Sequence, residues 1–462
     1  MRISVVLLAC IVGITSCSTE QDPFEHLKEI GEEMMGGDAT VFDMSVNAFG
    51  HAAPNLTGTK DLEFVTGNAF FKRNWVTSPA STEDLDGLGP LFNARSCSAC
   101  HLLDGRGAPP TDAAEEPLGL LFRLSVPDGA GGTKPDTYYG EQFNNHATQT
   151  VAPEGKVSVT YEEIKGTYPD GTTYTLRKPK NRFYDLNYGE LPADLMVSPR
   201  VAPHMVGLGL LEAVDENTLL SFANEQEVNN DGISGRPNYV WDILKGKKTI
   251  GRFGWKSNQP SVRQQVAGAF RGDIGITSAM FPEQPCADAQ TDCEKVYAEN
   301  GPELTNGILD RVTLYSATLA VPGRRDWEEP EVLKGKELFG QLNCIACHVP
   351  KMTTGSNGEI PEFKNQTIRP YTDLLLHDMG EELADHRPDE LATGLEWRTP
   401  PLWGIGLIHV VSGHTFLLHD GRARNMEEAI LWHGGEAQTS KEAFKNLQKT
   451  ERENVIKFLE SL

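Results

Sequence analysis

The chain lacks any long hydrophobic run beyond its first residues, and it is short of positive charge. No stretch after residue 17 is long and apolar enough for a membrane-spanning helix. Lysine and arginine number 42 against 65 aspartate and glutamate, so the formal net charge is −23. This charge argues against nucleic acid as a partner. No short tandem repeat is present, so a repeat architecture is not expected.

Cysteine is also scarce, at eight in 462 residues, but two copies of one pentapeptide take up half of them. The copies are residues 97–101 (CSACH) and 344–348 (CIACH). C-x-x-C-H is the attachment signature of c-type haem, because two thiols one helical turn apart can add to the porphyrin vinyl groups and the next imidazole then lies under the iron. The sequence therefore predicts two covalently bound haem c groups, with His101 and His348 as proximal iron ligands. The attaching thiols would be those of Cys97, Cys100, Cys344 and Cys347.

Two other uses of these cysteine pairs are conceivable from the sequence, a zinc site and a redox-active dithiol. The pairs could close a single Cys₄ zinc site, but both trailing histidines would then be unexplained. A redox-active dithiol of the thioredoxin kind would need a surrounding βαβ pattern, which is absent. The haem interpretation accounts for more of the sequence than either.

The first seventeen residues have the pattern of an export signal. A positive charge at Arg2 precedes an apolar run that is too short to span a bilayer comfortably. The run ends at residues 14–17 (ITSC), which resembles the bacterial lipobox, where the cysteine receives lipid and becomes the mature N-terminus. We therefore predict lipidation of Cys17 and a periplasmic protein anchored to a membrane, with Ser18 favouring the outer membrane. An ordinary cleaved secretory signal is the alternative.

Cys286 and Cys293 remain after the haem motifs and the signal region are assigned. They stand in a short polar loop, and disulfides persist in the oxidising environment outside the cytoplasm. We expect these two residues to form a disulfide. A free or metal-binding pair is the alternative, but no histidine lies beside them.

Composition and hydrophobic patterning divide the chain into six segments. The expected fold class is mainly α, with two cytochrome c-like haem domains and a strand-containing insertion between them. The segments are a lipoprotein signal peptide (1–16), a tether (17–58), a first haem-binding segment (59–125), the strand-containing insertion (126–250), a segment completing the N-terminal haem module (251–330) and a C-terminal cytochrome c domain (331–462).

Particular elements are expected within these segments. Alternating polar and apolar residues on both sides of a turn at 168–171 predict a β-hairpin. An apolar stretch over 198–214 predicts one buried helix, and an apolar stripe over 332–339 predicts a helix that runs directly into the second haem motif. Residues 450–453 are a candidate capping box for the last helix.

The order of these segments resembles the bacterial di-haem cytochrome c peroxidase superfamily, and more closely its di-haem oxidoreductase branch, some of whose members are labelled thiol oxidoreductases. The resemblance covers most of the chain beyond the tether. It implies an exported enzyme in which one haem, with both axial positions filled, relays electrons while the other binds hydrogen peroxide. Besides the haem motifs, it rests on residues 89–95 (GPLFNAR), 207–213 (GLGLLEA), 231–238 (DGISGRPN), 252–256 (RFGWK), 376–380 (LHDMG), 397–404 (WRTPPLWG) and 418–424 (LHDGRAR).

The sixth iron ligands decide these roles, because iron with a fixed sixth ligand can only pass electrons. In the peroxidases that the chain resembles, the C-terminal haem usually takes a Met immediately before a His-Asp-Gly sequence. Here that position is Leu418, which cannot coordinate iron. Met379 is the preferred replacement, His377 and His419 are alternatives, and an open iron is the remaining one.

For the first haem, no spacing selects a distal ligand among His146, His204, Met205 and Lys256. Three residues elsewhere are catalytic candidates. Trp255 suits a tunnelling bridge or a packing residue at the haem edge, and an ordinary core tryptophan is the alternative. His433 suits a general acid/base or a helix cap, and His419 is the third.

Glu227, Asn229 and Asp231 place oxygen-bearing side chains at alternate positions before Gly232, which partly matches a calcium-binding loop. The bidentate glutamate expected late in such a loop is absent, with Asn238 in its place. A structural Ca²⁺ is one interpretation, and a polar turn is the other.

The leading hypothesis is a peroxidase-like di-haem oxidoreductase that receives electrons from a small soluble donor. An electron-transfer module without substrate chemistry, serving a membrane-associated uptake or respiratory system, is the alternative. Oxidation of a protein or organic substrate is a third, weaker reading. The strong negative charge favours a cationic donor, although it equally suits the solubility of an exported protein.

Overall fold

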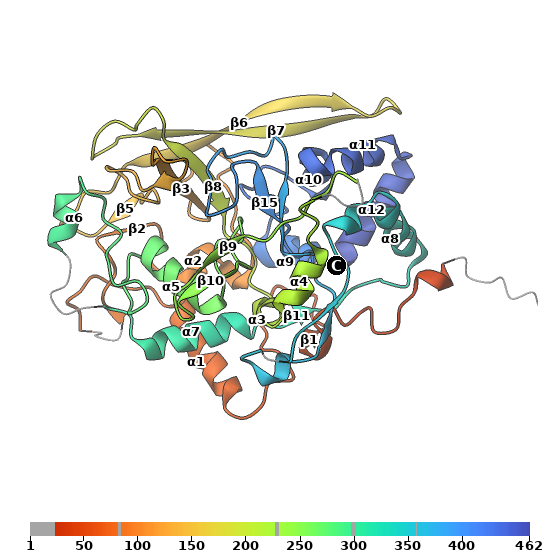
Figure 1. Cartoon of the computed structure of the whole chain (residues 1–462), viewed down its shortest axis with the longest axis horizontal. Coiled ribbons are helices and arrows are strands. Elements are labelled where there is room, and N and C mark those ends of the chain that lie inside the picture. The colour runs from red at the N-terminus through yellow and green to blue at the C-terminus, as the bar shows by residue number, and fades with distance from the viewer. Residues whose placement is uncertain (1–23, 82–84, 227–230, 297–301, 357) are drawn as a thin grey trace, which may run out of the picture.

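The structure, a computed structural model, describes residues 24–81, 85–226, 231–296, 302–356 and 358–462. Helices and short strands are interspersed along the chain, and the strands form several small sheets (Figure 1). The fold is therefore mixed α/β, which corrects the expectation of a mainly α protein. Many of these strands are only two residues long and join loops, so they leave no periodic signal in the sequence.

The helices are α1 (Lys60–Lys72), α2 (Cys97–Cys100), α3 (Leu208–Glu212), α4 (Glu216–Phe222), α5 (Val262–Asp273), α6 (Thr291–Lys295), α7 (Asn306–Ala317), α8 (Pro330–Gln341), α9 (Ile408–Ser412), α10 (Met426–Trp432), α11 (Gln438–Asn446) and α12 (Lys449–Ser461). The strands are β1 (Thr40–Val41), β2 (Leu91–Phe92), β3 (Leu120–Pro127), β4 (Thr133–Lys134), β5 (His146–Ala147), β6 (Lys156–Thr167), β7 (Thr173–Tyr184), β8 (Met196–Val201), β9 (Tyr239–Asp242), β10 (Lys247–Ile250), β11 (Val321–Pro322), β12 (Met352–Thr353), β13 (Thr367–Ile368), β14 (Leu376–Asp378) and β15 (Glu396–Arg398).

Helices α1, α2, α5 and α7 form the N-terminal haem module. Helix α7 packs against α1 and α5, and α1 also contacts α2, which carries the first haem motif. The ring centroids of Phe64 and Phe71 on α1 lie 4.7 and 5.1 Å from that of Tyr315 on α7. A Cβ atom on Gly67 would overlap the carbonyl oxygen of Arg311, so only glycine allows this close approach. The first motif is thus held on a packed helical frame.

Helices α8 and α12 pack together in the C-terminal module, and α8 runs into the second haem motif as expected. A Cβ atom on Gly335 would overlap the carbonyl oxygen of Asn454, so glycine again sets the helix spacing. The capping box of α12 consists of Gln448 and Glu451, which corrects its expected place at residues 450–453. The box lies earlier because the helix begins directly after Gln448, which makes Gln448 the N-cap residue and puts Glu451 at the third helical position.

Strands β6 and β7 form the expected hairpin, with 12 residues in each strand. In Figure 1 the hairpin lies along the top of the molecule and extends from the N-terminal module to the C-terminal one. At its tip, the Tyr168 hydroxyl donates to Glu427 at 2.8 Å, and Arg452 of α12 donates to Asp170 at 2.7 Å. The hairpin therefore links the two modules.

Residues 198–214 do not form the single buried helix that was expected. They contain the end of β8, a connection and then α3. Pro199 and Pro203 lack the backbone donors that a continuous helix needs. Strand β8 instead pairs antiparallel with β3, and this pairing brings Arg200 to the wall of the central cavity described below.

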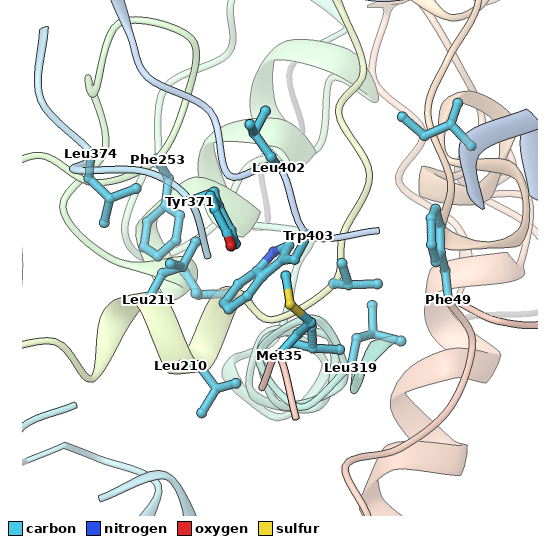
Figure 2. Packing of buried hydrophobic residues seen from close by; sticks show 14 of the residues in the cluster. Met35, Phe49, Leu210, Leu211, Phe253, Leu319, Tyr371, Leu374, Leu402 and Trp403 are labelled. Atoms are coloured by element: carbon cyan, nitrogen blue, oxygen red, sulfur yellow. The ribbon is translucent and has the colours of Figure 1, made fainter. Parts of the chain in front are cut away.

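Residues 24–58 pack onto the body of the molecule, which corrects the tether expected over 17–58; the start of that segment lies outside the described residues. Met35 and Phe49 are fully buried, and Figure 2 shows Met35 beside Trp403. Strand β1 pairs in parallel with β11. The buried residues of this segment follow no helix or strand period, so pattern analysis missed them.

The main hydrophobic core extends through both modules. Figure 2 shows part of it, where Leu211, Phe253, Tyr371 and Trp403 lie close together. A second cluster contains Phe122 of β3 and residues of the hairpin. Among the residues that the structure describes, no helix has the length and apolar character needed to cross a membrane.

Cys286 and Cys293 are joined by a disulfide, with their Cα atoms 5.8 Å apart. Cys293 is fully buried beside Leu91 and Val151. The disulfide therefore closes a short loop around the start of α6, and its buried end packs against the β2 region.

Replacing Cys286 with serine is expected to lower the free energy of unfolding by about 2 to 3 kcal/mol, because the crosslink restricts the unfolded chain. Denaturant-induced unfolding of the parent and the variant measures this difference. A reducing agent should destabilise the parent by a similar amount and leave the variant unchanged. A parent protein that is indifferent to reduction would contradict the prediction.

Candidate haem-binding cavity

The two C-x-x-C-H motifs open into one continuous cavity of about 860 Å³. Its wall contains both cysteine pairs and both motif histidines, together with side chains from α5, from the β3–β8 sheet and from the C-terminal module. A volume of this size suits a cofactor site. The fold thus brings together two motifs that are far apart in the sequence.

The first motif occupies the short helix α2, so Cys97 and Cys100 stand one turn apart. His101 follows directly, and its Nδ1 donates a hydrogen bond to the carbonyl of Pro203 at 2.8 Å. This bond fixes the orientation of the ring and leaves Nε2 free for iron. The ring of Phe71 lies 6.2 Å from that of His101 and packs beside it.

The second motif begins in a 3₁₀ turn over Cys344–Ala346. Nδ1 of His348 donates to the carbonyl of Tyr371 at 3.0 Å, and the ring of Phe339 lies 6.1 Å away. The arrangement around His348 therefore repeats that around the first motif histidine, although the two modules differ in their other elements. The repetition indicates the same use for both imidazoles.

Burial lowers the pKa of His101 and of His348 to about 4, so both rings are neutral, as iron coordination requires. Burial raises the pKa of Cys97, Cys100 and Cys344 to about 12. Reactive dithiols need lowered thiol pKa values, so this environment argues against a thioredoxin-like use. All four motif thiols are free of disulfides. These residues fit two covalently attached haems.

The metal alternatives can be compared with the geometry. Within the described ranges, no three His, Cys, Asp or Glu side chains converge as a metal site, so the cysteine pairs do not form a Cys₄ centre. Of the calcium candidates, Glu227 and Asn229 lie outside the described residues. Oδ1 of Asp231 accepts from the amide of Ile233 at 2.9 Å. The calcium site stays a prediction.

His377, a candidate sixth ligand, has both ring nitrogens engaged by carboxylates. Nε2 lies 2.8 Å from Asp373 and Nδ1 lies 2.7 Å from Glu436. Nδ1 also lies 3.5 Å from the sulfur of Cys347. With no nitrogen left for iron, His377 supports the wall of the cavity beside the second motif and does not act as a ligand.

The ion pairs of His377 make the stability of the protein depend on pH. Burial by itself lowers the pKa of His377, but Asp373, then Cys347 and then Glu436 outweigh it and hold the pKa well above 6.5. A group with a raised folded-state pKa contributes stability that is complete below the unfolded pKa and is lost as pH rises through the folded one. Above pH 6.5, the free energy of unfolding should therefore fall by up to about 1.4 kcal/mol per pH unit relative to His377→Gln. Denaturant titrations of both proteins between pH 6 and 9 measure this, and parallel pH profiles would contradict it.

His419 and Met379, the other two candidates, both line the cavity. The ring of His419 stacks on Trp397 with centroids 3.8 Å apart and planes 9° apart, and its Nε2 lies 3.6 Å from Asp420. Burial lowers the pKa of His419 to about 4. Met379 contacts both hydrophobic clusters, as a packing residue does. Leu418, where the resembled peroxidases have Met, also lines the cavity.

In His433, as in the two motif histidines, a backbone carbonyl holds Nδ1 of the ring. It follows α10, its Nδ1 donates to the carbonyl of Ala429 at 2.7 Å, and it lines the cavity. No partner for its Nε2 occurs in the described part of the chain. Burial chiefly lowers the pKa of His348, and His433 lowers it further, which places the two imidazoles within electrostatic reach. The structure thus makes His433 both the helix cap that was expected and a cavity residue with a free nitrogen.

The four candidates for the first haem divide into two pairs. His146 stacks on Phe92 and pairs with a glutamate, and Lys256 is fully buried with its Nζ 2.7 Å from Asp385; neither lines the cavity. His204 and Met205 do line it. They lie one and two residues after Pro203, however. The carbonyl of Pro203 accepts from Nδ1 of His101, the ring nitrogen that would not coordinate iron.

Trp255 lies where side chains of the two modules meet. Its Nε1 donates to the carbonyl of Val201 at 2.8 Å, so this N–H is not available as an acid. The guanidinium of Arg106 lies 5.2 Å from its ring centroid, and the amide of Arg398 donates to its carbonyl at 2.9 Å. A cation over the ring disfavours removal of an electron from it. The site therefore suits packing and electronic coupling.

Sequence reasoning missed Arg106 and Arg398, which line the cavity, and the two carboxylates that hold His377. Arg398 stands in a stretch that supported the family resemblance, so a signal for it existed without a role attached. Arg106 stands within residues 104–107 (DGRG), a turn-forming sequence after the first motif. For neither arginine does the spacing from the haem motifs in the sequence predict a contact with a cofactor.

Comparisons with known proteins agree with this geometry. A protein-family model described as "Di-haem oxidoreductase, putative peroxidase" matches residues 30–130 and 141–462. No curated protein sequence matches the chain. Among solved structures, the hydrazine synthase of Kuenenia stuttgartiensis, pressurised with 20 bar xenon, is similar at 16% identity with a TM-score of 0.24, over 38% of this chain and 63% of that one. This structural likeness is too low to support an argument.

Proposed function

Because the chain belongs to the di-haem oxidoreductase family, we propose that it reduces hydrogen peroxide with electrons from a small donor, relayed between two covalently bound haems. The reaction takes up two electrons and two protons and converts one hydrogen peroxide into two water molecules. His101 and His348 would hold the irons, and the four motif thiols would attach the porphyrins. Haem iron with an open axial position supplies peroxide binding and polarisation of the O–O bond.

Unequal surroundings of the two motif histidines support a division of labour. Near His348, the Nε2 of His433 is free and the residue lines the cavity, so we propose His433 as the sixth ligand of the C-terminal haem. Near His101, the two cavity-lining candidates stand within two residues of Pro203, whose carbonyl accepts from Nδ1, the nitrogen that would not coordinate iron. The N-terminal haem is then the one open to peroxide, and the C-terminal haem is the electron relay.

The chain's own residues position the cofactors and exclude water. Backbone carbonyls of Pro203 and Tyr371 fix the two imidazoles. The apolar wall between the motifs, which includes Trp255 and Leu418, keeps bulk solvent from the space between the haems. Rigid, dry surroundings lower the reorganisation that accompanies each electron transfer.

An electron-transfer module remains the second candidate, favoured by the presence of His204 and Met205 in the cavity wall. Ligation of the N-terminal iron by either side chain would fill both axial positions of both haems. Peroxide could then bind neither iron, and the protein would only pass electrons.

The donor and the location are part of the same proposal. The net charge of −23 favours a small cationic donor protein. The N-terminal sequence supports export and lipidation at Cys17, with retention at the outer membrane; these residues lie outside the described structure. The donor charge has a direct signature, since higher ionic strength should slow donor oxidation.

Peroxide-dependent oxidation of a reduced, basic cytochrome c tests the proposal. We expect turnover that saturates with peroxide and that is unchanged in His146→Ala, because His146 lies outside the cavity. Absence of turnover in the parent would overturn the peroxidase proposal. If Met205→Leu then gained turnover, the electron-transfer candidate with Met205 as ligand would be supported instead.

A further inference from the structure

Two buried guanidinium groups and one half-buried imidazole line the cavity where the two modules meet. They are Arg106, from the loop after the first motif, His204, and Arg398, from the end of β15. The two arginines are 6% and 8% exposed. Both flank Trp255, one over its ring and the other hydrogen-bonded to its backbone and to that of its neighbour Gly254. The two arginines therefore share one part of the cavity.

Neither arginine has a carboxylate partner among the described residues. Arg106 donates to the carbonyl of Leu418, and its Nε has no partner. Arg398 donates only to carbonyls, those of Gly254 at 2.8 Å and Thr399 at 3.3 Å. Buried guanidinium groups are costly unless an anion accompanies them. Because both groups line the cavity and Nε of Arg106 is unpartnered, this part of the cavity suits an anionic ligand.

The two acidic groups whose charges act on these arginines already pair with other side chains. Burial lowers the pKa of Arg106 to about 10, and Asp420 only partly offsets this; Asp420 accepts from Nε of Arg422 at 2.8 and 3.1 Å. Burial likewise lowers the pKa of Arg398 to about 10, and Asp373, which only partly offsets this, pairs with His377 at 2.8 Å. The protein itself thus leaves both guanidinium groups without a direct counter-charge.

His204 adds an independent observation. Both of its ring nitrogens are buried and have no hydrogen-bond partner. Burial lowers the pKa of His204 to about 3; the charge of Arg106 lowers it further, the nearby backbone of Trp403 opposes this, and the charges of Arg398 and then His101 lower it again. This electrostatic coupling places His204 near both arginines and near the first motif histidine. An unpartnered imidazole beside two unpaired guanidinium groups is a preformed carboxylate site.

We propose that Arg106, His204 and Arg398 together bind propionate carboxylates of the haems at the junction of the two modules, and so raise the reduction potential of the haem they contact. The inference rests on the two haems of the proposed function and is independent of peroxide turnover. A haem becomes more negative when it takes up an electron, and buried cations beside its propionates favour that reduced state. Because the guanidinium groups come from different modules, binding propionates would also fix the modules relative to each other.

Spectroelectrochemical titration of the holoprotein measures the effect. In Arg106→Leu and in Arg398→Leu, one midpoint potential should move negative by about 59 mV or more, a tenfold change in the reduction equilibrium. Arg106→Lys should recover most of the shift, because a cation remains. Haem content should stay at two per chain, since the thioether bonds are untouched.

Arg252→Leu is the matched control. Arg252 is also buried and unpaired with any carboxylate among the described residues, but it donates to the carbonyls of Leu211 at 3.0 Å and Val214 at 2.5 Å and does not line the cavity. Its loss should leave both potentials unchanged. If the control shifted the potentials as far as Arg106→Leu did, the effect would be structural and the inference would be wrong.

Two further outcomes would also overturn the inference. In the first, both cavity variants keep both parental potentials. In the second, the parent and Arg106→Leu have equal potentials without formate, and sodium formate changes the haem spectrum of the parent but not that of Arg106→Leu. The site would then bind a free carboxylate. Shifted potentials in a protein that never turns over peroxide would support this inference and overturn only the peroxidase proposal.

Discussion

His433→Leu should convert the C-terminal haem from a low-spin to a high-spin form. In the account above, Nε2 of His433 fills the sixth position, and leucine has no atom that can coordinate iron. The spin state of one of the two haems should therefore change completely. Electron paramagnetic resonance of the oxidised protein measures this change. In His433→Met, a thioether would replace the imidazole, and the potential of that haem should rise by on the order of a hundred millivolts.

Met379→Leu is the matched control for this prediction, because Met379 lines the same cavity and its backbone lies close to Gly434, the residue after His433. The spin state should be unchanged in Met379→Leu. If instead Met379→Leu gave the high-spin form and His433→Leu did not, the preference drawn from the sequence would be correct and the ligand derived from the structure would be wrong.

Glu32→Ala should lower the free energy of unfolding by about 3 to 5 kcal/mol. Glu32 pairs with Arg324 in a contact where both side chains are almost fully buried, and Lys336 lies 2.7 Å from the same carboxylate. Removing the carboxylate leaves an uncompensated guanidinium inside the protein. The pair joins residues 24–58 to the rest of the fold, so the loss tests whether this segment belongs to the folded body.

Denaturant-induced unfolding measures the effect of Glu32→Ala. Glu25→Ala is the control, because Glu25 forms only an exposed pair with Lys28, and such pairs contribute at most about 1 kcal/mol. Equal stability losses in the two variants would show that the Glu32 pair does not fasten the segment, and the earlier expectation of a loose tether would return.

The parts of the site that could be predicted from the sequence are those that local chemistry fixes. The haem motifs need only five consecutive residues, and the structure places both on one cavity. The hairpin around residues 168–171 and the helix before the second motif also followed from local periodicity. In each case, the signal and the structure lie within one short stretch of chain.

The parts that could not be predicted depend on contacts between distant residues. His377 looked like a ligand until Asp373 and Glu436 were seen to occupy its nitrogens. His433 was a candidate general acid/base or helix cap and not a candidate ligand, because its approach to the second motif is set by the packing of α10 in the C-terminal module. Buried cations such as Arg106 follow no period, since their role depends on what lies opposite them in space.

Quantitative electron paramagnetic resonance of the oxidised holoprotein, followed by rapid mixing of its mixed-valence form with hydrogen peroxide, tests the central claim most directly. We expect one low-spin haem with two histidine ligands, one high-spin haem, and a fast optical change of the high-spin haem on mixing. Two low-spin haems that ignore peroxide in every redox state would contradict it and would identify an electron carrier.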